Sequence, residues 1–173
     1  AGAGEKLNQA FVVAGKSHLR FDGMYFRDYN MRYAHANVPW GWPPVKAAEI
    51  SLYSCRDIDV TRCMSDGRGG YSASFIHAVQ VRELTVANCV ALNKMGVMSL
   101  YRCPDARIRH TVFARPLIAT FNLNNPAEQK VHFRKNIFCG MLRKKAALNI
   151  RYAELENAAS LVLKDNCFFV RQF

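Results

Sequence analysis

A histidine, a tyrosine and an arginine stand at polar positions beside three short apolar segments. His77 lies within Ile76-His77-Ala78, Tyr101 follows Met98-Ser99-Leu100, and Arg151 follows Leu148-Asn149-Ile150. These are the side chains that a lyase acting on an acidic sugar needs: a base, an acid for the leaving oxygen, and a group that neutralises the substrate carboxylate. We therefore predict His77 and Tyr101 as base and acid and Arg151 as the carboxylate partner, with Arg68 or Asn122 as the alternatives to Arg151. The alternative for His77 is a surface histidine without a role.

Other chemistries find less support in the residue pattern. Hydrolysis of a glycosidic bond needs paired carboxylates, and the segments above supply only Glu49, with Asp66 nearby. A calcium site needs several converging acidic ligands, which the sequence does not supply, so we predict no cofactor and keep calcium as the alternative. No cysteine pair has zinc spacing, and the glycines at 67–70 do not follow a strand-to-helix phosphate motif.

The elements that must position these residues form a repeat. Six segments share the pattern apolar, any, apolar, two residues, then a small, amide or apolar residue, and their third positions are 21, 60, 86, 110, 133 and 163. The intervals of 39, 26, 24, 23 and 30 residues suit one coil of a β-solenoid, which needs three short strands and three turns. Apolar residues alternate with period two, and Gly, Pro and Asn interrupt every window long enough for a helix. The competing fold is a β-sandwich, which would not need a near-constant period.

The sequence resembles the parallel β-helix repeat superfamily, which includes pectate lyases and other polysaccharide-active solenoids. The resemblance covers roughly residues 11–169 and lies in the turn motif of Phe133-Arg134-Lys135-Asn136-Ile137-Phe138 and Leu163-Lys164-Asp165-Asn166-Cys167-Phe168. It implies an all-β fold, a single right-handed parallel β-helix of about six or seven coils spanning residues 1–173, either whole or as a fragment of a longer chain. It also implies a ladder of stacked turn side chains, expected at Met24, Cys63, Cys89, Phe113, Asn136 and Asn166. Cysteine at this position fits a small buried thiol, so we expect free thiols, with a Cys63–Cys89 disulfide as the alternative.

In the enzymes of that superfamily the substrate lies along the outer face of the first strand of each coil. Carried over, the outward residues are Ser51, Tyr53, His77, Ser99, Tyr101, Asn122, Asn149 and Arg151. Loop residues would flank them: Asp66, Arg68 and Tyr71 from one loop, and Trp40 and Trp42 from the inserted aromatic loop 28–47. The substrate-binding set is therefore Trp40, Trp42, Tyr53, Asp66, Arg68, Tyr71, Asn122 and Asn149. Trp40 and Trp42 could instead pack down and cover the solenoid flank.

The composition bounds the partners. Lys plus Arg is 24 against 13 Asp plus Glu, a net charge of +11, which favours polyanions such as acidic polysaccharides. The densest basic patch is Arg134, Lys135, Arg143, Lys144 and Lys145, whose alternative is a solvated face. Nucleic acid is disfavoured because no nucleic-acid-binding motif accompanies the charge, and no apolar run reaches membrane-spanning length.

These observations lead to two functional hypotheses. The first is an extracellular or periplasmic carbohydrate-active protein, a lyase on an acidic polysaccharide, with the location implied by the resemblance alone. The second is a non-catalytic structural, adhesive or carbohydrate-binding solenoid, or an incomplete piece of a larger enzyme. The open ends of such a solenoid would be covered by end-to-end contact or by a partner.

Overall fold

The computed structural model describes residues 10–27, 48–67, 74–94, 96–115, 119–126, 128–139, 150–151 and 160–169. Within these ranges the chain forms three parallel sheets of six strands each. Sheet A contains β1 (Phe11–Ala14), β4 (Ala48–Tyr53), β7 (Ser74–Val79), β10 (Gly96–Tyr101), β13 (Ala119–Asn124) and β16 (Ile150–Arg151). Sheet B contains β2 (Ser17–Asp22), β5 (Arg56–Thr61), β8 (Arg82–Ala87), β11 (Ala106–Arg109), β14 (Val131–Arg134) and β17 (Leu161–Lys164). Sheet C contains β3 (Tyr25–Arg27), β6 (Met64–Asp66), β9 (Val90–Leu92), β12 (Val112–Ala114), β15 (Ile137–Cys139) and β18 (Cys167–Phe169).

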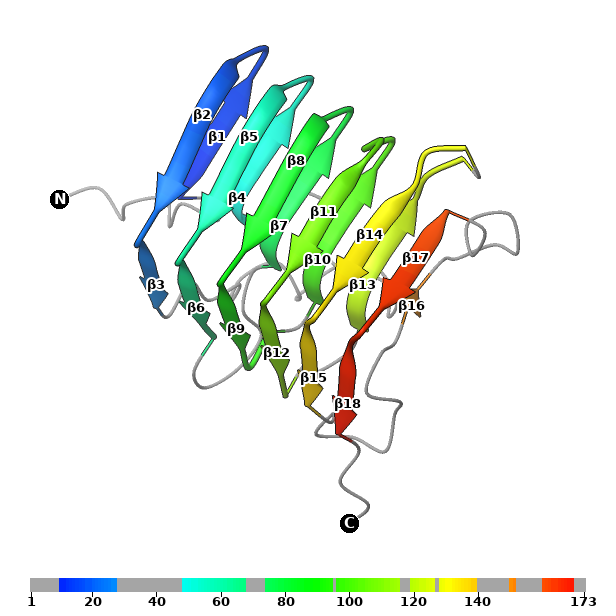
Figure 1. Cartoon of the computed structure of the whole chain (residues 1–173). Coiled ribbons are helices and arrows are strands. Elements are labelled where there is room, and N and C mark those ends of the chain that lie inside the picture. Colours follow the sequence, from blue (N-terminus) through cyan, green and yellow to red (C-terminus); the bar gives the residue numbers. More distant parts are fainter. Residues whose placement is uncertain are drawn as a thin grey trace, which may run out of the picture.

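Each coil passes once through sheets A, B and C before the next coil begins beside it (Figure 1). The prediction of an all-β parallel solenoid is confirmed, and no helix that could cross a membrane occurs among the described residues. Alternate residues of the strands point into one continuous core, which includes Ile50, Ile76, Leu84, Val86 and Phe133. Because the side-chain period of a strand is two, the intervening residues face outward.

The chain turns from one sheet to the next through residues of positive φ. Between sheets A and B these are Gly15, Ser54, Gln80 and Arg102, and between B and C they are Gly23, Arg62, Asn88, His110, Lys135 and Asp165, all with φ between 50° and 66°. A non-glycine residue in this conformation costs about 1 kcal/mol or more. The turns keep their coil-to-coil hydrogen bonds, for example from Ser54 N to Val79 O at 2.9 Å, which offset that cost.

The predicted ladder of turn side chains is present between sheets B and C, with one correction. Thr111, and not Phe113, occupies the ladder position of its coil, because Cys89 N donates to Thr111 Oγ1 at 3.4 Å and Thr111 N donates to Asn136 Oδ1 at 3.0 Å. The next rung repeats the pattern, with Asn136 N donating to Asn166 Oδ1 at 2.9 Å. Phe113 lies in β12 and stacks on Phe138 inside the solenoid, with ring centroids 5.3 Å apart.

The same coil corrects the repeat itself. Strand pairing aligns Phe21, Val60, Val86, Ile108, Phe133 and Leu163. Position 108 therefore takes the place that the repeat assigned to His110, and His110 is the positive-φ residue of the turn.

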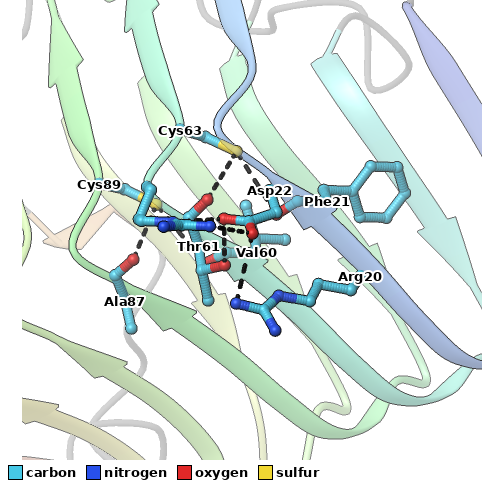
Figure 2. A network of polar contacts seen from close by, with 9 residues as sticks. Arg20, Phe21, Asp22, Val60, Thr61, Cys63, Ala87 and Cys89 are labelled. Atoms are coloured by element: carbon cyan, nitrogen blue, oxygen red, sulfur yellow. Dashed lines mark hydrogen bonds and ion pairs between the residues drawn. The ribbon is translucent and has the colours of Figure 1, made fainter.

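All six cysteines are free, as expected. Cys63 and Cys89 occupy adjacent rungs of the ladder, and Figure 2 shows their sulfur atoms beside backbone carbonyls of the turn. Cys63 Sγ lies 3.3 Å from Thr61 O, and Cys89 Sγ lies 3.3 Å from Ala87 O. The thiols thus take the place of amide side chains in the early coils.

Candidate functional site

The outward residues predicted for sheet A occupy one line of the strand register. Ser51, His77, Ser99, Asn122 and Arg151 are successive partners across β4, β7, β10, β13 and β16. Tyr53 and Tyr101 lie two residues further along their strands, on either side of Val79. The predicted alternation therefore holds along this sheet.

His77 is held between two tyrosine rings. Its ring centroid lies 5.7 Å from that of Tyr53 and 5.6 Å from that of Tyr101, both at steep interplanar angles. The His77 side chain is only 5% exposed, and the neighbouring Ser51 is fully buried. Burial lowers the pKa of His77 below its usual value, so the imidazole is neutral at pH 7. We predicted that a substrate groove runs over this line, but at His77 the side chain is buried and does not line an open groove.

The other predicted site residues are not all gathered here. Arg151 lies three strands from His77, about 14 Å along the sheet at the usual strand spacing, and Asn122 lies two strands away. Only the backbone positions of Asn122 and Arg151 are described. Five predicted residues lie outside the described ranges, together with loop 28–47: Trp40, Trp42, Arg68, Tyr71 and Asn149.

Asp66 was predicted to lie in a loop, but it lies at the end of a strand. It is the last residue of β6 in sheet C and is 2% exposed. Asn93 Nδ2 donates to Asp66 Oδ1 at 2.9 Å. The Asp66 carboxylate therefore has a hydrogen-bond donor within the protein. Its role as a substrate ligand stays a prediction.

The outer face of sheet B carries charged side chains along its whole length. In the first coils these side chains form ion pairs. Arg62 Nε donates to Asp22 Oδ1 at 2.8 Å, and Arg20 approaches the same carboxylate at 3.3 Å (Figure 2). The Arg62 guanidinium holds the pKa of Asp22 well below its usual range. One coil along, Arg56 Nε donates to Glu83 Oε2 at 3.0 Å. Carboxylates of adjacent coils thus neutralise Arg62 and Arg56, and a carboxylate of its own strand neutralises Arg20.

The later coils of the same face carry cations that acids approach less closely: Arg107 acts on the carboxylate of Glu83 only at longer range, where it helps to lower the pKa of Glu83. A hollow of about 460 Å³ is lined by Thr85, Arg107, Ile108, Arg109, His132 and Arg134. Strand pairing places Arg107 beside His132, and Arg109 beside Arg134, which in turn pairs with Lys164. Among the described residues Arg107 and Arg109 form no ion pair, and Arg134 makes one long contact to Asp165 at 3.7 Å. We call this surface the basic hollow.

The basic hollow was only partly visible in the sequence. The predicted patch contained Arg134 and Lys135, but Arg143, Lys144 and Lys145 lie outside the described ranges. The signal that could have found it is the alternation in Arg107-Ile108-Arg109 and His132-Phe133-Arg134. Period-two spacing directs all four polar side chains to one face once the two strands are known to pair.

No family model, curated protein or solved structure matches this chain. The strand topology shows the parallel β-solenoid fold, and none of the three comparisons confirms the resemblance to polysaccharide-active β-helices. Among the described residues no three His, Cys, Asp or Glu side chains gather as a metal site would require.

The buried histidine predicts a pH-dependent stability. A histidine whose folded pKa lies below the unfolded value of 6.5 contributes full stability above that pH, and stability falls as the pH drops below it, because the unfolded chain then binds the extra proton. We expect the urea midpoint to fall between neutral pH and about pH 5, and His77→Phe to reduce that fall. An equal slope in wild type and His77→Phe would contradict a buried neutral imidazole.

Proposed function

We propose that this β-solenoid is a binding protein for an acidic polysaccharide, which it holds along the basic hollow of sheet B. The observation that carries the proposal is the pairing of Arg107 with His132 and of Arg109 with Arg134 around one hollow. Cations on adjacent coils repeat about every 4.8 Å. A polymer with an acidic group on each sugar can therefore meet one coil after another.

The residues of the basic hollow suit an acidic polysaccharide better than a nucleic acid. Proteins that bind single-stranded nucleic acid combine cations with aromatic side chains on which bases stack. The residues lining the hollow include no Phe, Tyr or Trp. Arginine forks instead suit bidentate contacts with carboxylates or sulfates.

The test is a titration of the full chain with a uronate-containing polysaccharide and with a neutral polysaccharide of similar length. Binding to the acidic polymer alone is expected, and it should weaken as salt screens the charges. Arg109→Gln and Arg134→Gln should each weaken binding roughly 2- to 5-fold, since exposed charge pairs contribute up to about 1 kcal/mol. Arg20→Gln is the matched control, because Arg20 lies on the same register line as Arg107 but is paired with Asp22.

Two outcomes would reject the proposal. Equal weakening by Arg20→Gln would mean that binding follows net charge and not the hollow. If the chain bound single-stranded DNA more tightly than any acidic polysaccharide, nucleic acid would be the better assignment for the ligand of the basic hollow.

A second candidate is the lyase, with a location outside the cytoplasm as the resemblance implies. This function is favoured by the closeness of His77 to Tyr101, whose ring centroids lie 5.6 Å apart. Burial also lowers the pKa of His77, and a neutral imidazole can accept a proton. Incubation with uronate polymers should then produce ultraviolet absorbance from an unsaturated product, lost in His77→Ala and Tyr101→Phe and reduced in Arg151→Gln. The low exposure of His77 makes binding without catalysis the better-supported function.

A further inference from the structure

A lysine and a glutamate are buried together at the corner between sheets A and C. Glu49 of β4 and Lys94, two residues after β9, are both fully buried, and Lys94 Nζ contacts Glu49 Oε1. Their positions are 45 residues apart in the chain. Neither side chain belongs to the basic hollow or to the His77 line.

The surroundings exclude water from this pair. Glu49 and Phe75 occupy equivalent positions of paired strands, and Phe75 is fully buried against Phe26. Ser65 is also fully buried, and its Oγ donates to Glu49 Oε2 at 2.5 Å. Removing two opposite charges from water is expensive, and their mutual attraction often fails to repay that cost.

Burial drives both groups toward their uncharged forms. It raises the pKa of Glu49, against the opposing effects of Lys94 and Ser65, and it lowers the pKa of Lys94, against the opposing effects of Glu49 and Asp66. An uncharged amine is a nucleophile, and an uncharged carboxyl group is a better acceptor of it than a carboxylate. Intramolecular reactions between well-oriented groups reach effective molarities on the order of 10⁵–10⁸ M.

We infer that Lys94 and Glu49 are joined by an amide bond between Nζ and Cδ. The amine lone pair attacks Cδ of the neutral carboxyl, and the C–N bond forms. The C–Oε1 bond breaks, and Oε1 leaves as water with the carboxyl proton and one proton from the amine. The reaction is a condensation and needs no oxidant or reductant.

The arrangement favours both the reaction and its product. Ser65 polarises the carboxyl group through Oε2, which is the oxygen that the amide keeps. The product is a neutral group that cannot ionise, so it carries no desolvation cost of a buried charge. The bond ties β4 to the segment after β9 and so connects two successive coils.

The test is the mass of the intact, denatured chain. The expected mass is that of the sequence less one water. Trypsin should then yield residues 47–56 joined to residues 83–102, with no cleavage after Lys94. Lys94→Arg is the matched control: it keeps the positive charge beside Glu49, but its guanidinium stays protonated and is no nucleophile, so its mass should equal that of its sequence.

Two results would overturn the inference. A wild-type chain of full sequence mass, with ordinary cleavage after Lys94, would show that the pair is ionic only. A linked peptide containing residues 63–68 in place of 47–56 would assign the bond to Asp66. Because mass is measured on unfolded protein, a variant that folds poorly does not obscure either result.

Discussion

Lys94→Met is expected to lower the free energy of unfolding by about 3–5 kcal/mol, because it leaves a buried carboxyl group without its partner. Glu49 is fully buried in β4, and Ser65 would be the remaining side chain that donates to it. A thioether side chain cannot replace the link between Lys94 Nζ and the Glu49 carboxyl group. The measurement is urea unfolding followed by circular dichroism, with Lys16→Met at an exposed lysine as the control, which should change stability by less than about 0.5 kcal/mol.

The loss in Lys94→Met should depend on pH in a defined direction. Burial raises the pKa of Glu49 above the ordinary 4.5. A carboxyl group with a raised folded pKa contributes full stability below the unfolded value and loses it as the pH rises, because the unfolded chain then releases its proton. The deficit should therefore be largest at neutral pH and shrink toward about pH 4. The double variant Glu49→Leu/Lys94→Met should recover much of the stability, and a double variant as weak as the single one would contradict the account.

Asn136→Ala should cost at least about 2 kcal/mol, because it orphans buried backbone groups of the ladder. Asn136 is 1% exposed; its Oδ1 accepts from Thr111 N at 3.0 Å and its Nδ2 donates to Ile108 O at 2.9 Å. Each buried donor or acceptor left unsatisfied costs about 1–3 kcal/mol.

Thermal or urea unfolding checks this cost against Asn124→Ala. Asn124 is an exposed asparagine of β13, so its replacement should change stability by less than about 0.5 kcal/mol. If the two substitutions lowered stability equally, the hydrogen bonds of the ladder would contribute nothing to the free energy of unfolding.

The fold was predictable because a parallel solenoid repeats its alternation and its turn residues. Asn136 and Asn166 were found in the sequence as rungs because an amide can donate and accept in the same turn. Thr111 was missed because Ile108 was taken as the first apolar position of its segment, a place that belongs to Ala106. The slip was two residues, and with a side-chain period of two it leaves the inward face unchanged. The fold class therefore survived the error.

The candidate site was less predictable than the fold. Alternation predicted that Ser51, His77 and Ser99 share one line across the strands, and the strand register shows that line. It could not show that His77 would be 5% exposed, because periodicity reports the face that a side chain takes and not what covers that face. Asp66 was misplaced for a related reason: its polarity and the following glycines indicated a loop, whereas Asn93 satisfies it at the end of a strand.

The sequence alone thus determined the local properties of this protein: strands of period two, turn residues at near-constant intervals, and a surplus of positive charge. Only the tertiary structure decided which charges are neutralised. Arg62 meets Asp22 from 40 residues away and Lys94 meets Glu49 from 45, while Arg107 and Arg109 form no ion pair among the described residues. Such pairing depends on how adjacent coils align, and coil alignment is set by packing and hydrogen bonding between segments far apart in the chain.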